Sequence, residues 1–190
     1  MTGRLVLVVG PSGAGKDTLL DGARLALAES PHFVFQQRDI TRPADAGGEH
    51  HRAITTAEFE AVKAAYGYAL DWQAHGLGYG VPVAIDAAIA RGQIVVVNCS
   101  RGVIDAARQR YPRLAVIEVS APPAVLAMRL AARGREDQES IRKRLERSVS
   151  AVADHPDVFR VSNDGDVASG ISTLLGVLQG LTAWPWDMPK

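Results

Sequence analysis

The stretch Leu5-Val6-Leu7-Val8-Val9-Gly10-Pro11-Ser12-Gly13-Ala14-Gly15-Lys16-Asp17 decides the fold of this 190-residue chain. Its first five residues are apolar without interruption, which is typical of a strand buried on both faces of a parallel sheet. Gly10 and Pro11 end that strand, and apolar residues then recur at helical spacing from Gly15 to about Ala28. The order of strand, glycine-rich turn and helix predicts a loop that binds phosphate.

The turn matches the Walker A pattern of glycine, four residues, glycine and lysine. Its glycines let several backbone N–H groups point at one phosphate, and the start of the helix adds its positive end. Lys16 supplies a mobile cation for the terminal phosphates. An ordinary glycine-rich turn is the alternative, but the lysine and the strand-to-helix context argue against it. The predicted ATP-binding residues of the loop are Gly10, Pro11, Ser12, Gly13, Ala14, Gly15, Lys16, Asp17 and Thr18.

The residue after the lysine departs from the pattern, because Asp17 stands where Ser or Thr normally holds Mg²⁺. The apolar run Ile94 to Val97 also ends in Asn98 and Cys99, without the aspartate that a Walker B strand carries. Mg²⁺ accepts one or two carboxylates beside phosphates and waters. We therefore expect Asp17 to supply the missing carboxylate, directly or through a water. The alternative is a first-turn acid that is favoured only by the helix dipole.

Further apolar runs alternate with helical patterns along the chain. This alternation predicts an α/β fold with a central parallel sheet of about five strands and helices on both faces. A hairpin is expected for Tyr68 to Ala74 and Tyr79 to Val83, and Thr55 with Glu58 resembles a helix start. The expected strands are Leu5–Val9, Phe33–Ile40, Ile94–Val97, Leu114–Val119 and Val158–Val161. The expected later helices are Pro82–Ala90, Val103–Arg110, Ala121–Ala132, Gln138–Ala153 and Val167–Leu181.

The composition narrows the classes of partner. Twenty-one basic residues balance twenty-one acidic ones, whereas a nucleic-acid binder usually has a basic excess. No apolar run approaches the length of a membrane span, and the single cysteine, Cys99, excludes an internal disulfide. We expect a cytoplasmic protein that acts on a small molecule, without nucleic acid or membrane partners. The oligomeric state is left open.

Several segments carry a resemblance to a known family. The sequence resembles the guanylate kinase-like branch of the nucleoside monophosphate kinases, and within it the ribose 1,5-bisphosphate phosphokinases of phosphonate breakdown. The resemblance runs from Leu5 to about Leu178, and the Lys-Asp end of the loop and the Val-Asn-x-Ser-Arg stretch favour the ribose bisphosphate enzymes. The segments are residues 10–17, Ile40-Thr-Arg42, Gly48-Glu-His-His51, residues 72–81, residues 95–101, residues 129–136 and Ser162-Asn-Asp-Gly165.

The resemblance implies an activity, cofactors and a domain plan. It implies that ATP and Mg²⁺ are used to phosphorylate ribose 1,5-bisphosphate to 5-phosphoribosyl 1-diphosphate, with release of ADP. It also implies one P-loop kinase domain over residues 1–190. The expected core comprises residues 1–35, 92–132 and 154–182, with an acceptor-binding subregion at about 36–91 and a mobile lid at about 133–153.

The acceptor region departs from guanylate kinases in the groups that read a base. By the resemblance, Leu70 (or Asp71), Val81 and Cys99 stand at base-reading positions, while the phosphate holders Arg42 and Tyr79 remain. Without hydrogen-bonding groups there is little reason for GMP to be preferred. Loop and strand-end positions add polar groups to this side. The predicted acceptor-binding residues are Arg42, Tyr79, Asn98, Ser100 and Arg101. For the two arginines, the alternative interpretation is an ordinary exposed arginine on the surface.

The family match assigns the remaining site residues. Arg133 and Arg144 are the expected transition-state arginines, Arg135 is expected near the adenine or the phosphates, and Asn163 is expected on the adenine. A solvated charged face is the alternative for the arginines, and a plain turn for Asn163. His51 is expected in place of a phosphate-binding tyrosine, and Cys99 as a small buried side chain.

Two other functions stay open at this stage. One is a guanylate kinase or another small-molecule kinase, and the other is a non-catalytic, guanylate kinase-like interaction module. Lys16, Arg42, Arg133 and Arg144 count against the module, which has no need of all four.

Overall fold

The computed structural model describes residues 3–43, 50–132 and 151–183. These residues cluster into two compact units. The first unit comprises the described parts of Met1–Leu7 and Leu27–Ala115, and the second those of Val8–Ala26 and Val116–Lys190.

The central sheet has five strands and confirms the expected α/β class. Strand β1 (Arg4–Val9) is buried at every position, as a strand covered on both faces should be. Pairing is parallel between β2 and β7 and between β8 and β9. The order of the strands is β2 (Phe33–Phe35), β7 (Ile94–Asn98), β1, β8 (Leu114–Ser120) and β9 (Val158–Ser162).

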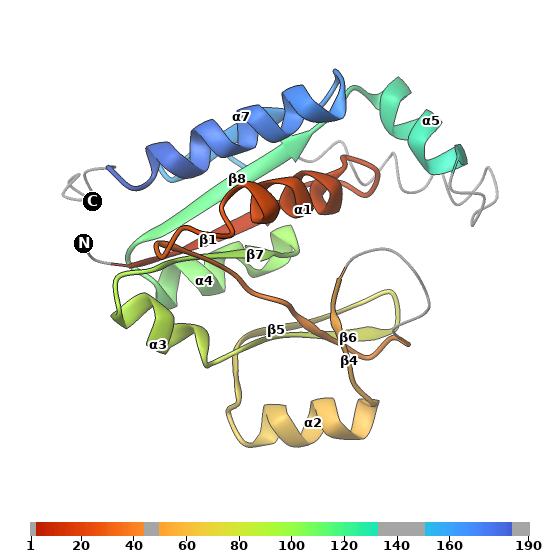
Figure 1. Cartoon of the computed structure of the whole chain (residues 1–190). Helices are drawn as coiled ribbons and strands as arrows, with labels where there is room; N and C mark the ends of the chain where they lie inside the picture. The colour runs from red at the N-terminus through yellow and green to blue at the C-terminus, as the bar shows by residue number, and fades with distance from the viewer. Residues whose placement is uncertain (1–2, 44–49, 133–150, 184–190) are drawn as a thin grey trace. The chain divides into compact units, whose positions relative to one another are not determined.

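The second unit packs helices closely on one another. Helix α1 (Lys16–Ala26) lies beside α7 (Val167–Gly180), and α5 (Pro123–Ala132) follows β8 (Figure 1). A Cβ at Gly22 of α1 would stand 2.3 Å from Ile171 Cδ1 of α7, so glycine is what allows this close approach. The apolar faces of the two helices bury Leu19 and Leu174 completely. This packing fixes the helix that follows the predicted phosphate loop.

The first unit carries a second sheet of four strands. Its order is β4 (Arg52–Ala53), β3 (Asp39–Ile40), β6 (Leu77–Pro82) and β5 (Tyr68–Ala74). Strands β5 and β6 form the expected hairpin, in which Trp72 pairs with Tyr79. Its turn is made by His75 (φ 53°) and Gly76 (φ 72°), both in the left-handed region that a tight hairpin turn requires. The hairpin thus begins its second strand at Leu77, two residues earlier than expected.

Helix α2 (Thr56–Ala64) covers one face of this sheet (Figure 1). The expected helix start is confirmed, since Thr55 and Glu58 form a capping box. The ring of Phe59 stacks on Tyr68 with centroids 5.2 Å apart. A Cβ at Gly78 would stand 3.0 Å from the Phe59 ring, and one at Gly80 2.3 Å from the Tyr68 ring. The two glycines therefore make room for the aromatic side chains behind the hairpin.

The segment Phe33 to Ile40 was expected to be one strand, and this prediction is wrong. The backbone N–H of Gln36 still donates to Val96 O of β7, but that of Thr41 donates to Gly78 O of the second sheet. The chain therefore leaves one sheet and enters the other within residues 36–38, which form no strand. The sequence of this polar stretch does not show the change of sheet, because either sheet can provide hydrogen-bond partners for its backbone.

The other elements follow the expectations with shifted ends. Helix α3 (Ile85–Ala90) starts three residues later than expected, and a 3₁₀ turn, η2 (Arg101–Val103), precedes α4 (Ile104–Arg110). The predicted helix Gln138–Ala153 lies mostly outside the described residues, and its described part, residues 151–153, is not helical.

Candidate active site

The phosphate loop takes its shape from three glycines of the second unit. Gly10, Gly13 and Gly15 have φ angles of 142°, 88° and 87°, all in the region that L side chains rarely adopt. A Cβ at Gly10 would lie 2.1 Å from the backbone oxygen of Val119. The backbone conformation of the loop between β1 and α1 therefore requires glycine at these three positions.

Lys16 is folded along this loop. Its Nζ donates to the carbonyl oxygens of Gly10 and Pro11, at 2.9 Å each. The ammonium group thus lies at the loop, where a cation for the terminal phosphates is needed. Asp17 follows in the first turn of α1 and is half-buried, whereas Thr18 is exposed. The loop also contains Ser12, which is exposed, and Ala14, which is fully buried.

Asn163 supports the loop from the end of β9. Its Nδ2 donates to Ala14 O at 2.7 Å, and its backbone N–H donates to Ser120 O at 2.7 Å. Arg129 of α5 donates through Nη1 to Asn163 O at 3.0 Å. Asn163 is only 5% exposed, and its side chain supports the loop through the bond to Ala14. Its contact with adenine stays a prediction.

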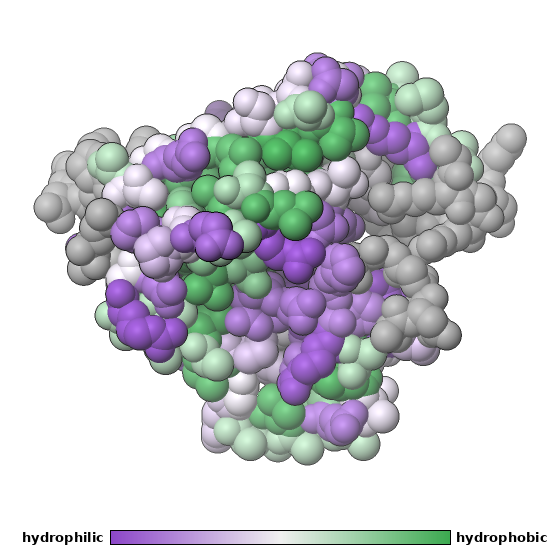
Figure 2. Space-filling model, in the orientation of Figure 1, coloured by the Kyte–Doolittle hydropathy of each residue, from purple (hydrophilic) through white to green (hydrophobic). Residues whose placement is uncertain are grey.

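The first unit presents a second group of predicted site residues on the hairpin. Residues that pair directly on neighbouring strands point to the same side of a sheet. Leu70 pairs with Val81 and Trp72 with Tyr79, so these four share one side, opposite to the side that α2 covers. We call this group, together with Arg38 and Arg42, the hairpin face. Figure 2 shows hydrophilic residues gathered over β5 and β6, with more apolar surface over α2.

The hairpin face differs sharply from the side toward α2. On the α2 side, the carboxylate of Asp39 accepts two hydrogen bonds from Arg52, at 2.7 Å and 2.5 Å, and one from Tyr68 Oη at 3.0 Å. Burial and the bond to Asp39 raise the pKa of the Tyr68 hydroxyl above its ordinary value. The hairpin face carries no carboxylate; its charged groups are the guanidiniums of Arg38 and Arg42, and Leu70 and Val81 are buried.

Arg42 forms hydrogen bonds with a histidine, His51, through both its backbone and its side chain. His51 Nε2 lies 3.1 Å from Arg42 O, and because a carbonyl oxygen only accepts, Nε2 carries the proton. The other ring nitrogen, Nδ1, then accepts from Arg42 Nη2 at 3.5 Å. The structure thus brings His51 to the predicted phosphate holder, as expected for a replacement of the family's tyrosine, although phosphate contact by either residue stays a prediction.

Sequence reasoning missed Arg38. Its guanidinium carbon lies 5.5 Å from the ring centroids of both Trp72 and Tyr79, which stack on each other with centroids 5.2 Å apart. The side chain is largely buried, with 7% of the residue exposed. The only signal in the sequence was a single arginine within a run that alternates like a strand.

The carboxyl end of β7 contributes the remaining acceptor-side residues. Asn98 ends the strand, Ser100 Oγ accepts from the backbone N–H of Gly102 at 3.3 Å, and Arg101 opens η2. Ser100 therefore caps the 3₁₀ turn, which lies against β5 of the hairpin. Cys99 is 3% exposed, and burial raises the pKa of its thiol to about 12, so it is the small buried side chain that was expected rather than a nucleophile.

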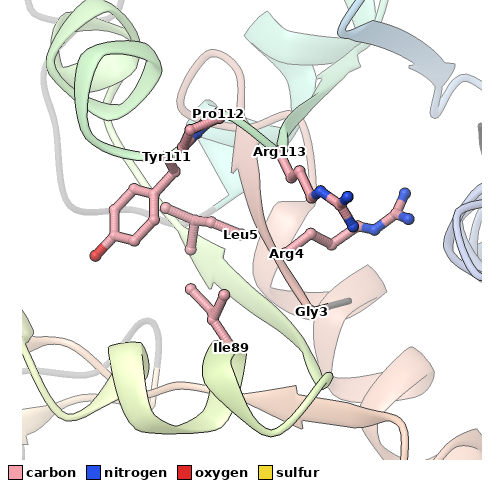
Figure 3. A pocket seen from close by; sticks show the side chains of 7 residues that line it. All are labelled: Gly3, Arg4, Leu5, Ile89, Tyr111, Pro112 and Arg113. Carbon is pink, nitrogen blue, oxygen red and sulfur yellow. The ribbon is translucent and has the colours of Figure 1, made fainter. Parts of the chain in front are cut away.

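A cavity of about 160 Å³ lies at the amino end of β1, whereas the phosphate loop follows the carboxyl end of that strand. None of the predicted site residues lines this cavity. Figure 3 shows Arg4 and Arg113 side by side at this cavity, with Leu5, Ile89 and Tyr111. Burial, and then the charge of Arg113, lower the pKa of Arg4 to about 10. Ligands of open α/β sheets bind at the carboxyl ends of the strands, and this cavity is at the amino end of β1.

Three predicted residues, Arg133, Arg135 and Arg144, lie outside the described residues. In the described ranges, no three His, Cys, Asp or Glu side chains gather as a metal site. None of the helices in residues 3–43, 50–132 and 151–183 is long and apolar enough to cross a membrane.

Comparison with named relatives shows the family to which this chain belongs. A family model described as an AAA domain matches residues 5–156. The ribose 1,5-bisphosphate phosphokinase PhnN of Agrobacterium fabrum is 45% identical over 92% of this chain and 96% of its own, and that of Rhodopseudomonas palustris is 48% identical over 93% and 89%. The chain belongs to the ribose 1,5-bisphosphate phosphokinase family.

Longer members of the phosphokinase family carry a second activity in their names. The bifunctional ribose 1,5-bisphosphokinase-thymidine phosphorylase of Azorhizobium caulinodans is 46% identical over 96% of this chain, which spans only 26% of that protein. Among solved structures, guanylate kinase from Anaplasma phagocytophilum shares the fold, with a TM-score of 0.65 over 97% of this chain and 89% of its own, at 15% identity. This chain therefore has the guanylate kinase-like fold that the sequence predicted.

Proposed function

We propose that the protein transfers the γ-phosphoryl group of ATP to the 1-phosphate of ribose 1,5-bisphosphate. The products are 5-phosphoribosyl 1-diphosphate and ADP. The observation that carries this proposal is the hairpin face, which offers two guanidiniums and no carboxylate, together with the glycine-rich phosphate loop and its Lys16. The names of the relatives support the same reaction.

The transfer is a displacement at phosphorus. An oxygen of the acceptor's 1-phosphate forms a new bond to Pγ, while the bond from Pγ to the β,γ-bridging oxygen breaks. The electron pair of that bond leaves with ADP, so atoms and charge balance without a further reactant. Catalysis of such a step consists mainly of positioning and of meeting the charge on the transferred group.

The phosphate loop would hold the donor. Its glycines open the backbone for the β- and γ-phosphates, and Lys16 would move from the carbonyl oxygens of Gly10 and Pro11 onto the terminal phosphates. Asn163 and Arg129 keep the loop in this shape through their bonds to Ala14 and to each other. The exposed Thr18 is proposed as a further ATP-binding residue.

The donor set also fits a magnesium ion. The half-buried Asp17 offers one carboxylate next to Lys16, and the described residues hold no cluster of three acidic or histidine ligands. One carboxylate plus phosphate oxygens and waters is a coordination that Mg²⁺ accepts. When bound, Mg²⁺ would offset negative charge on the phosphates, and Asp17 would hold it directly or through a water.

The acceptor and the lid complete the proposal. Arg42, steadied by His51, and Tyr79 would hold the reacting 1-phosphate, with Asn98, Ser100 and Arg101 at the end of β7. Arg133 and Arg144 are proposed as the cations that meet the transferring group, with Arg135 near the adenine or phosphates. We further propose that residues 133–153 act as a lid on a core and an acceptor subregion, in a cytoplasmic enzyme.

Product analysis tests the proposed reaction. The purified protein is incubated with ATP, Mg²⁺ and ribose 1,5-bisphosphate, and the products are followed by ³¹P NMR. We expect equal amounts of ADP and of a product whose 1-position carries a diphosphate, and no product with the Lys16→Ala variant. Release of inorganic phosphate alone, or no turnover with this acceptor, would overturn the proposal.

A further inference from the structure

Trp72 lies on the hairpin face without a role in the assigned chemistry. Its ring stacks on that of Tyr79, with centroids 5.2 Å apart and an angle of 5° between the planes. The guanidinium carbon of Arg38 lies 5.5 Å from both ring centroids. The Trp72 ring is therefore held by two side chains, one from β6 and one from the segment before β3.

The polar ends of the two stacked rings are accessible. Within the described residues, neither the indole Nε1–H of Trp72 nor the hydroxyl of Tyr79 bonds to another protein group, and neither atom is enclosed. Both side chains are half-buried. The opposite side of the same sheet differs, since the Tyr68 hydroxyl donates to Asp39 at 3.0 Å. The hairpin face thus presents two aromatic rings in fixed positions, with polar ends that a ligand can reach.

A phosphate group matches these two polar ends. The indole N–H can only donate and the tyrosine hydroxyl can also donate, whereas the oxygens of an ionised phosphate accept. With hydrogen bonds of about 3 Å to different oxygens, one phosphate can contact groups on two rings whose centroids are 5.2 Å apart. Tyr79 is already proposed to hold the reacting 1-phosphate, and Trp72 is stacked directly on it. Trp72 is therefore next to the place where that phosphate would bind.

We propose that Trp72 is a further acceptor-binding residue, whose indole N–H donates a hydrogen bond to the reacting 1-phosphate beside Tyr79. This inference rests on the proposed function and adds one phosphate-binding group to its acceptor site. The stack keeps the two donors side by side before the acceptor arrives. Trp72→Phe retains a stacked ring and removes only the donor, so the hydrogen bond can be tested apart from the packing.

Two sugars that differ by the reacting phosphate test this role. Wild type, Trp72→Phe and Trp72→Leu are titrated by calorimetry, without ATP, with ribose 1,5-bisphosphate and with ribose 5-phosphate. We expect Trp72→Phe to bind the bisphosphate about 10-fold more weakly, the size of one hydrogen bond to a charged group, and ribose 5-phosphate as tightly as wild type. Its thermal midpoint and its KM for ATP should not change. Trp72→Leu should weaken the bisphosphate further, because Tyr79 also loses its stacking partner.

Tyr66 provides a matched control. It follows α2, is 88% exposed, and belongs to the same unit as the hairpin. Tyr66→Phe also removes the polar end of an aromatic side chain, but away from the hairpin face. It should leave the affinity for both sugars unchanged.

Two results overturn the role of Trp72. A Trp72→Phe variant with wild-type affinity for the bisphosphate shows a residue that only packs on Tyr79. An equal loss of affinity for both sugars shows that Trp72 does not bind the 1-phosphate. Failure of the proposed function is distinct from either, since wild type would then bind the bisphosphate more tightly than Trp72→Phe does and transfer no phosphoryl group to it.

Discussion

The phosphate loop and the hairpin face are built in opposite ways. The loop is defined by backbone: three glycines with positive φ, and a lysine whose ammonium group bonds to loop carbonyls. The hairpin face is defined by side chains: Trp72 and Tyr79 stack on neighbouring strands, Leu70 pairs with Val81, and Arg38 lies over the two rings from the segment before β3. Its backbone would accept many other side chains at the same positions.

This difference separates what is general in the enzyme from what is specific. Every nucleoside triphosphate presents the same phosphates, so a loop that reads them through backbone N–H groups needs no variation. Acceptors differ from one enzyme to another, and strands allow their side chains to change without a change of fold. We therefore expect substitutions in the loop to affect every acceptor equally, and substitutions on the acceptor side to change the choice of acceptor.

Loss of the lysine should have the largest effect. Lys16→Ala removes the cation for the terminal phosphates, and we expect kcat/KM to fall about 1,000-fold for every acceptor. Circular dichroism should show an intact fold, because Lys16 bonds to Gly10 and Pro11 of its own loop and is not part of the buried apolar core. Lys63→Ala, at an exposed lysine of α2 paired with Asp71, is the control. A Lys16→Ala enzyme with near wild-type turnover would remove the loop from the mechanism.

A single methyl group at Gly10 should have the next largest effect. Gly10→Ala places a Cβ 2.1 Å from Val119 O at a φ of 142°, which forces the backbone to move. We expect a strain of about 3 kcal/mol, equivalent to about 100-fold weaker ATP binding when the loop must keep its shape. Gly165→Ala, where a Cβ meets nothing within 4 Å, should bind ATP normally. Equal ATP affinity in both variants, measured by calorimetry, would contradict the backbone account of the loop.

The acceptor-side counterpart is Arg101. We expect Arg101→Ala to lower kcat/KM for ribose 1,5-bisphosphate about 30-fold, the size of one lost charge-assisted hydrogen bond, with little change in the KM for ATP. Arg108→Ala, on α4 and paired with Asp105, should leave both constants unchanged. A rise in the KM for ATP that equals the loss with the acceptor would place Arg101 on the donor side instead.

The smallest of these effects concerns the metal. Asp17→Asn should raise the Mg²⁺ concentration for half activity about tenfold, as expected for a group that orients or holds the ion. Asp17→Ser should recover part of the loss, because Ser is the usual ligand there. Asp21→Asn, one turn further along α1, is the control. An unchanged Mg²⁺ dependence in both Asp17 variants would leave the carboxylate as a helix-dipole residue only.

Much of the fold followed from local patterns. The run Leu5 to Val9 and the hairpin around Gly76 each carry their own signal, an apolar run in one case and alternation with a turn in the other. The segment Phe33 to Ile40 does not, since its passage from one sheet to the other depends on Val96 and Gly78, which are distant in the sequence. Such a change of sheet is a tertiary effect that periodicity cannot show.

In the candidate site, too, features with a local sequence signal could be predicted, and those that depend on tertiary contacts could not. The loop could be predicted because its chemistry is local. Asn163 was found through the family match, but its bond to Ala14 was not predicted. Arg38 was missed because one arginine in a strand-like run has no pattern, and its meaning comes from Trp72 and Tyr79 across two strands. A predicted acceptor site is therefore least complete where contacts between strands create it.

The central claim is that the acceptor side has given up base recognition for phosphate recognition. The most direct measurement compares kcat/KM for ribose 1,5-bisphosphate and for GMP, by coupled detection of ADP at fixed ATP and Mg²⁺. Leu70, Val81 and Cys99 offer a base no carboxylate or hydroxyl, and the loss of about two buried hydrogen bonds predicts a ratio of at least about 100 in favour of the sugar bisphosphate. Equal or better turnover of GMP would contradict the account and identify the hairpin face as a nucleotide site.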